Sequence, residues 1–420
     1  MTIKLNNQVN LHIIPTNKYK TVRIVVRFAT PLDAITSSKR SLLASLMETN
    51  SLNFPDQVAL SKKLAELYGA GFYVSVNRTG NQHYLSIGLN VINDNIAPNG
   101  VSILEDSVEF LKEIIFNPNI KNNAFNTETF AREKENLIVD IESIFDDKQT
   151  YAAMSLQNLF FSDNKNQKTP SFGDIEQIKQ ETPESIAEYY TDMIAHDKID
   201  ILVSGNVEEG YVERCFKNFG FVDREEMKTD LFYKQPFKNI IQQKSEVLPV
   251  VQSKLNIGYH CDVYYHDDMY FPLMVFNGLF GGFPHSKLFL NVREKHSLAY
   301  YASSSIDPFR GFISVQTGID SSNRERVLRL VNEQLKDMTA GEFSDELLEQ
   351  TKKMLINQYL LSSDNQRAVV EQHYLFSNVP YADLSQEEWM KKMNAVTKED
   401  VQDVATGINL QAVYFMEGGK

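Results

Sequence analysis

An arginine and a tyrosine in the second half of the chain have side chains suited to holding a peptide. Tyr300 follows Arg293 by seven residues. The pattern predicts a short helix over residues 286–294 and a strand over 300–305, so both side chains would meet at a helix-to-strand corner. Guanidinium and phenol groups are hydrogen-bond donors. Two such donors facing one spot could bind a peptide carbonyl and stabilise the oxyanion formed when it is attacked.

The same two residues also have a purely structural interpretation. Arg293 would then interact with the carbonyl end of its helix through the helix dipole, and Tyr300 would pack at the start of its strand. Helix ends and strand starts accept these residue types readily, so the spacing alone leaves both interpretations open.

The elements that would position this pair belong to a pattern that occurs twice. In the first half, strands and helices alternate and end in a helix opened by Thr182-Pro183 and a closing strand. The first half is expected to hold strands at 22–28, 72–77, 84–90 and 199–204, and helices at 41–50, 57–68, 101–116, 127–145, 183–196 and 208–219.

The second half repeats this order. Phe125-Asn-Thr-Glu and Phe343-Ser-Asp-Glu open a long helix in each half, and Thr182 and Thr397 open the last one. The second half is expected to hold strands at 254–259, 300–305, 312–318 and 412–416, and helices at 268–280, 286–294, 325–338, 344–362 and 398–405.

A repeat of this length predicts a duplicated domain rather than a solenoid. The fold class is expected to be α+β, with two tandem homologous domains that each have an antiparallel sheet covered by helices. The domains are placed at residues 1–222 and 247–420, with a charged, weakly periodic linker at 223–246.

The chain resembles the insulinase/pitrilysin family of inverted zincins over nearly its whole length. The resemblance rests on the tandem units, the Arg293 and Tyr300 spacing, and Thr182-Pro-Glu-Ser-Ile-Ala-Glu-Tyr-Tyr leading to Ile-Leu-Val-Ser-Gly205. It implies that the two units pack as half of a clamshell. It also implies that Arg293 and Tyr300 correspond to the family's pair that binds the substrate backbone.

Active members of that family carry H-x-x-E-H on the first helix of the first half, and this motif is missing here. No two of the eight histidines stand four residues apart, the spacing that puts two ligands on one helix face. The alignment with the family puts Ala44 and Glu48 at the histidine positions and Met47 at the position of the base. Ala and Met cannot replace imidazole ligands.

A second helix resembles the one that supplies the family's third ligand. Glu133 and Asp140 stand seven residues apart there, as the family's glutamate pair does. Asp140 could be a ligand, but one carboxylate does not bind zinc tightly. The degenerate metal site is therefore expected to comprise Ala44, Met47, Glu48 and Asp140, and to hold no metal.

Composition narrows the choice of partners and of compartment. The formal net charge of −13 argues against nucleic acid. The run from 270 to 283 is too short to span a bilayer, and the first residues lack the apolar core of a signal peptide. With only Cys215 and Cys261, a disulfide scaffold is excluded. We expect a soluble, cytoplasmic protein that does not bind membranes.

The resemblance implies a function that is split between two chains. We expect an inactive homologue without a cofactor, which forms a heterodimer with a zinc-bearing paralogous subunit and contributes Arg293 and Tyr300 to peptide processing. The chain is not expected to be catalytic alone. The alternative is a non-catalytic peptide-binding or assembly scaffold, and homodimerisation of the isolated chain stays open. No G-x-S-x-G motif signals a self-sufficient hydrolase.

Overall fold

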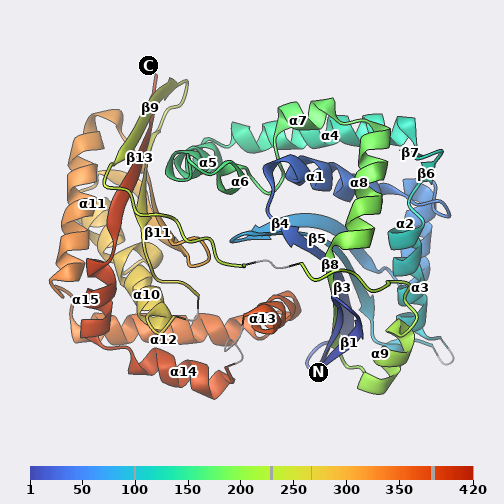
Figure 1. Cartoon of the computed structure of the whole chain (residues 1–420). Coiled ribbons are helices and arrows are strands. Elements are labelled where there is room, and N and C mark those ends of the chain that lie inside the picture. The colour runs from blue at the N-terminus through green and yellow to red at the C-terminus, as the bar shows by residue number, and fades with distance from the viewer. Residues whose placement is uncertain (99–100, 228–229, 266, 380–383, 420) are drawn as a thin grey trace. The chain divides into compact units, whose positions relative to one another are not determined.

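The chain forms two compact units, each built around one large sheet, in a computed structural model (Figure 1). The structure describes residues 1–98, 101–227, 230–265, 267–379 and 384–419. Each unit takes a segment from the other half of the chain. Unit 1 comprises Met1–Glu142, Thr169–Asp230 and Ser363–Leu375, and unit 2 comprises Ser143–Lys168, Leu231–Ser362 and Phe376–Lys420.

The sheet of unit 1 is mixed, with six strands. In spatial order they are β1 (Thr2–Asn6), β2 (Val9–Pro15), β8 (Lys198–Gly205), β3 (Thr21–Pro31), β5 (Gln82–Ile92) and β4 (Gly71–Thr79). Neighbours run antiparallel except β2 and β8, which are parallel. The α+β class is confirmed, but the sheet expected to be antiparallel contains this one parallel pair. β2 and β8 are joined by a long stretch of helices and strands, and only such a crossover permits parallel pairing.

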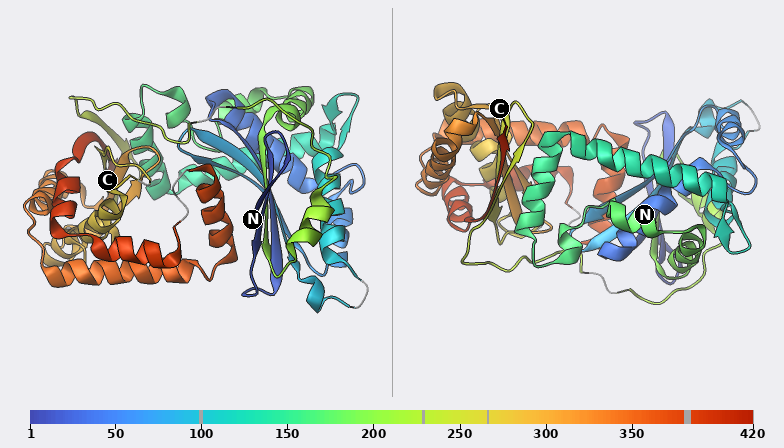
Figure 2. Two further views of the ribbon diagram at one scale, coloured as in Figure 1. Left: turned by 60° about the horizontal axis from the view of Figure 1, so that its bottom comes forward. Right: turned by 90° about the horizontal axis from the view of Figure 1, so that it is seen from above.

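Helices cover both faces of this sheet. Because side chains alternate along a strand, Ile24, Val26 and Phe28 point into the main core, whereas Val25 points to the other face. Figure 2 shows α13 on the opposite side of the sheet from α3 and α9. The helices that supply the main core are α1 (Ala34–Thr49), α3 (Ile103–Phe116), α8 (Pro183–His196) and α9 (Glu209–Phe216), and α13 is Gln366–Asn378.

Smaller elements complete the first half. They are α2 (Gln57–Glu66), η1 (Asp94–Ile96), the short pair β6 (Ile120–Lys121) and β7 (Ala124–Phe125), α4 (Thr127–Asp146), α6 (Lys165–Lys168) and α7 (Ile175–Gln180). Of these, α2 and α4 line the pocket described below.

The sheet of unit 2 is also mixed, with five strands. In spatial order they are β11 (Ala299–Asp307), β12 (Phe312–Ile319), β10 (Ser253–His260), β13 (Asn409–Gly418) and β9 (Gln242–Leu248). Only β9 and β13 are parallel. β9 begins inside the segment expected to be a linker, so the end of that segment is part of the sheet.

Helices again lie on both faces. Leu255, Ile257 and Tyr259 of β10 point into the main core. On the other face, α5 (Lys148–Phe160), which comes from the first half of the chain, packs against Phe312 and Tyr414. The remaining helices are α10 (Tyr270–Asn277), η2 (Gly278–Gly282), η3 (Leu288–Lys295), η4 (Ser321–Asn323), α11 (Arg324–Thr339), α12 (Asp345–Ser362), α14 (Gln386–Ala395) and α15 (Lys398–Thr406).

Candidate functional site

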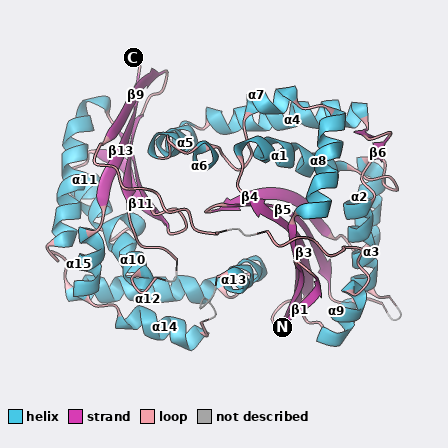
Figure 3. Ribbon diagram, viewed as in Figure 1, coloured by secondary structure: helices cyan, strands magenta, loops and turns pink. Residues whose placement is uncertain are grey.

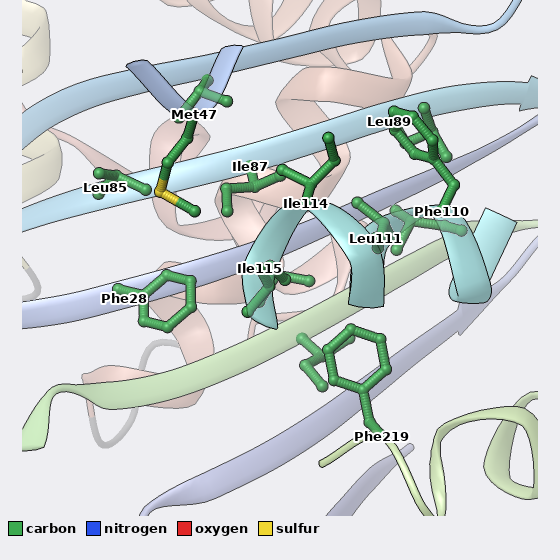
Figure 4. Close-up of a cluster of buried hydrophobic side chains, with 14 of the residues drawn as sticks. Phe28, Met47, Leu85, Ile87, Leu89, Phe110, Leu111, Ile114, Ile115 and Phe219 are labelled. Atoms are coloured by element: carbon green, nitrogen blue, oxygen red, sulfur yellow. The ribbon is translucent and has the colours of Figure 1, made fainter. Parts of the chain in front are cut away.

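Helix α1 carries the positions aligned with the family's metal-binding motif. Its N-terminus is capped by Asp33, whose carboxylate accepts hydrogen bonds from two backbone N–H groups of the first turn. Ala44 and Met47 are 5% and 1% exposed and belong to the main core of unit 1. Figure 4 shows Met47 among Leu85, Ile87 and other apolar side chains of that core. At these positions the helix therefore presents packing groups instead of ligands.

Glu48 lies on the same helix but faces outward, into a pocket of about 830 Å³ between α1, α2, β4 and α4. Glu133 and Asp140 of α4 line the same pocket. The structure thus brings Glu48, Glu133 and Asp140 to one place in unit 1. The other lining residues are Ser45, Thr49, Gln57, Leu60, Ser61, Leu64, Phe72, Glu135, Asn136, Leu137 and Val139.

Burial and a neighbouring charge act on the carboxylates of this pocket. Burial raises the pKa of Glu48, a hydrogen bond from the Val74 N–H opposes this, and the charge of Glu133 raises it further. Glu133, 8% exposed, accepts a hydrogen bond from Arg132 Nε at 2.9 Å. The charge of Glu133 thus disfavours ionisation of Glu48, and the adjacent residue Arg132 is an ion-pair partner of Glu133.

The residues present do not fit a zinc ion. Structural and catalytic zinc sites use at least three nitrogen, sulfur or carboxylate ligands with tight geometry. Across the described ranges of the chain, no group of three or more His, Cys, Asp or Glu side chains is arranged to hold a metal. The chemistry of a metallopeptidase therefore cannot be derived from this pocket.

Arg293 lies in unit 2, near the end of η3, a helix wound with the wider π-type turn where the sequence predicts an ordinary helix. Its guanidinium carbon lies 4.5 Å from the ring centroid of Phe289, and its Nε is 3.6 Å from the carboxylate of Glu294. The side chain is 41% exposed. Stacking on an aromatic ring orients a guanidinium without neutralising it.

Tyr300 stands at a β-bulge at the start of β11. Ala299 pairs with Ile319 and Tyr301 with Gly318, so Tyr300 is the extra residue of the bulge. Its side chain is 70% exposed. The bulge turns Tyr301 inward instead, where its ring lies 5.2 Å from Lys254 Nζ.

Between the two residues the chain makes a tight corner. Ser297 adopts a left-handed backbone conformation with φ of 50°, and the Leu298 N–H donates to the Val292 carbonyl at 3.0 Å. Arg293 and Tyr300 both reach solvent at this corner. Among the described residues, no hydrogen bond or ion pair joins them directly, so both keep donors available to a ligand.

Sequence reasoning did not predict that Phe289 contacts Arg293. The signal was present, because residues four apart on a helix are neighbours and an aromatic ring before an arginine can support it. The π-type turn of η3 and the bulge at Tyr300 carry no comparable signal, since both depend on how η3 and β11 pack in unit 2.

Comparisons with known proteins show which family the chain belongs to. A family model described as "Peptidase M16 inactive domain" matches residues 180–355. Over 411 residues the chain is 33% identical to the "Probable inactive metalloprotease YmfF" of Bacillus subtilis (strain 168), with 97% of this chain and 95% of that protein covered. The chain belongs to the M16 peptidase family, and the resemblance to insulinase and pitrilysin is confirmed.

Solved structures share this fold, and one of them is also similar in sequence. A conserved protein from Enterococcus faecalis V583 matches with a TM-score of 0.97 and 52% identity, covering 100% of this chain and 98% of that one. The peptidase M16 inactive domain from Pseudomonas fluorescens shares the fold, with a TM-score of 0.80, 15% identity and coverage of 100% and 98%. In the described part of the chain, no helix combines the length and apolar character needed to cross a bilayer.

Proposed function

We propose that this chain is the zinc-free subunit of a two-chain M16 metallopeptidase that processes peptides in the cytoplasm. A paralogous partner carrying H-x-x-E-H would hold the zinc and perform hydrolysis. This chain would contribute Arg293 and Tyr300 to substrate binding. The observation that carries the proposal is a contrast. Ala44 and Met47 are buried apolar residues where a zinc ligand and the general base would be needed, whereas the two donors of unit 2 are exposed.

Two exposed hydrogen-bond donors would suit a peptide carbonyl. Arg293 remains charged at any physiological pH, and its guanidinium offers several donors in one plane. No hydrogen bond engages the Tyr300 hydroxyl among the residues that the structure describes. Hydrogen bonds from such donors strengthen when negative charge develops on the carbonyl oxygen. The pair would therefore favour the transition state over the bound substrate.

The test is reconstitution. The chain and its H-x-x-E-H paralogue from the same genome are purified separately, and peptide cleavage is measured for each alone and for the mixture. We expect cleavage by the mixture that exceeds that of either chain. Arg293→Ala should lower kcat/KM of the mixture by roughly ten- to a hundredfold, because a hydrogen bond to a charged group contributes about 1.5–3 kcal/mol.

Arg326→Ala is the matched control, since Arg326 is an exposed arginine on α11 of the same unit. It should leave kcat/KM unchanged. Tyr300→Phe removes only the hydroxyl and should lower kcat more than it raises KM. If Arg293→Ala and Tyr300→Phe both leave the activity of the mixture intact, the pair has no part in catalysis.

That last result would favour the alternative, a peptide-binding or assembly scaffold of the same fold. The scaffold hypothesis predicts that the chain binds the partner or the peptide equally well with and without Arg293. Binding measured by calorimetry with the single variants therefore separates the two functions.

A further inference from the structure

The duplicated architecture leaves one strand of unit 2 without a neighbour that its counterpart in unit 1 possesses. β2 and β9 are both seven residues long, and each pairs in parallel with the strand that closes its half of the chain, β8 or β13. In unit 1, β1 adds to the outer side of β2 in antiparallel fashion. Within the described residues, β9 pairs with β13 alone and forms the sheet edge (Figure 3).

Strand β9 is therefore much more exposed to solvent than its counterpart β2. β2 is mostly buried, whereas Gln243, Ser245 and Val247 of β9 are exposed. Apolar side chains on and beside the strand are also open to solvent, with Ile240 at 73%, Val247 at 66% and Val251 fully exposed. An edge of this kind presents a row of unpaired backbone N–H and C=O groups beside apolar side chains.

The usual protection against edge pairing is weak in β9. The strand contains no proline, and its register with β13 is continuous, without a bulge. It carries one lysine, Lys244, whose charge lies close to Glu246 of the same strand at 3.6 Å. Proteins that must keep an edge free commonly interrupt it by proline, bulges or repeated charges.

We propose that β9 of one copy pairs in antiparallel fashion with β9 of a second copy, joining the two five-stranded sheets across a twofold axis. With the strands fully overlapped, the axis passes through Ser245, and Lys244 of each copy lies opposite Glu246 of the other. The interface thus contains two reciprocal pairs of opposite charge. The charge order of β9 is complementary to itself in this register, which favours a second copy over an unrelated strand.

This pairing is independent of the peptide-binding role. β9 and β11, which carries Tyr300, are the two opposite edges of the sheet. A dimer through β9 therefore leaves the corner of Arg293 and Tyr300 open.

The decisive experiment uses charge reversal and mixing. Sedimentation of the full-length wild-type chain should give a mass twice the 48.1 kDa of one chain. Lys244→Glu places like charges opposite each other, as does Glu246→Lys, and each should raise the dimer dissociation constant by about tenfold or more. An equimolar mixture of the two variants restores opposite charges at both positions and should dimerise as the wild type does. Lys353→Glu, at an exposed lysine of α12, is the control.

Glu246 also accepts a hydrogen bond from the Tyr414 hydroxyl, so its variant needs a check of folding by circular dichroism. A second measurement does not depend on that variant. Ser245→Cys, in a Cys215→Ser background, places two thiols at the axis and should give a disulfide-linked dimer on mild oxidation, whereas exposed Ser303→Cys on β11 should not. A monomeric wild type, or folded charge variants that fail to associate on mixing, would overturn the proposal.

Discussion

The guanidinium of Arg293 owes its orientation to packing more than to charge pairing. It lies over Phe289, while the nearest carboxylate, that of Glu294, is 3.6 Å away and 56% exposed. A solvent-exposed ion pair of this geometry contributes little. The stacked ring limits the rotamers of the arginine without consuming its hydrogen-bond donors. Phe289 is thus expected to be a positioning residue for the pair.

Phe289→Leu keeps the apolar volume and removes the aromatic face. In the reconstituted two-chain enzyme we expect kcat/KM to fall by about two- to fivefold, the equivalent of about 0.5–1 kcal/mol for an exposed cation–π contact. Because Arg293 is proposed to favour the transition state over the bound substrate, the loss should appear mainly in kcat if the ring orients Arg293. Phe289→Tyr should retain full activity, and equal activity of both variants would show that the ring does not position the arginine.

At the scale of elements, the parallel junction of β2 and β8 contains a buried charged cluster. The carboxylate of Asp200 on β8 is fully buried and lies 2.9 Å from His12 Nε2, 3.1 Å from Asn10 Nδ2 and 3.1 Å from Lys198 Nζ. Burial alone would raise the pKa of Asp200, but the hydrogen bond from His12, the charge of Lys198 and the bond from Asn10 lower it to about 2.

The lowered pKa makes the stability of unit 1 sensitive to acid. Because the folded state holds the ionised form more strongly than the unfolded chain, with its usual pKa of about 3.9, Asp200 contributes roughly 2.6 kcal/mol well above that pH. The contribution is lost as the pH falls from 4 toward 2, and about half of it is gone by pH 3. The free energy of unfolding of wild type and of Asp200→Asn is measured with urea at pH 6 and at pH 3. The difference between the two proteins should be smaller at pH 3 by about 1 kcal/mol. A gap independent of pH would contradict this assignment.

At the scale of the whole molecule, the zinc content of the purified chain tests whether the fold of the family is present without its metal site. After dialysis against a chelator and reloading with zinc, we expect the purified chain to bind far less than one ion, because one carboxylate pocket without imidazole ligands does not hold zinc tightly. Elemental analysis measures the number of zinc ions bound per chain. An H-x-x-E-H paralogue treated in parallel is the positive control. One tightly bound zinc per chain would contradict the degenerate site.

Much of this organisation could be predicted from the order of residues. The α+β class, the duplication and the elements around Arg293 and Tyr300 follow from periodicity and from caps such as Thr182 and Thr397, whose capping boxes the structure contains. The parallel pairs β2–β8 and β9–β13 were missed, because strand direction depends on partners distant in sequence. The helices α5 and α13 were missed as well, and each packs on the sheet of the unit opposite to its own half of the chain.

The sequence by itself determined that no pair of imidazoles is available and that an arginine and a tyrosine stand seven residues apart, because both are properties of residue type and spacing. Only the tertiary structure decided that Met47 is a core residue, that Tyr300 is turned outward by a bulge, and that β9 is an open edge. The physical reason is that burial, bulges and sheet edges arise from contacts between segments far apart in the chain, which local periodicity does not encode.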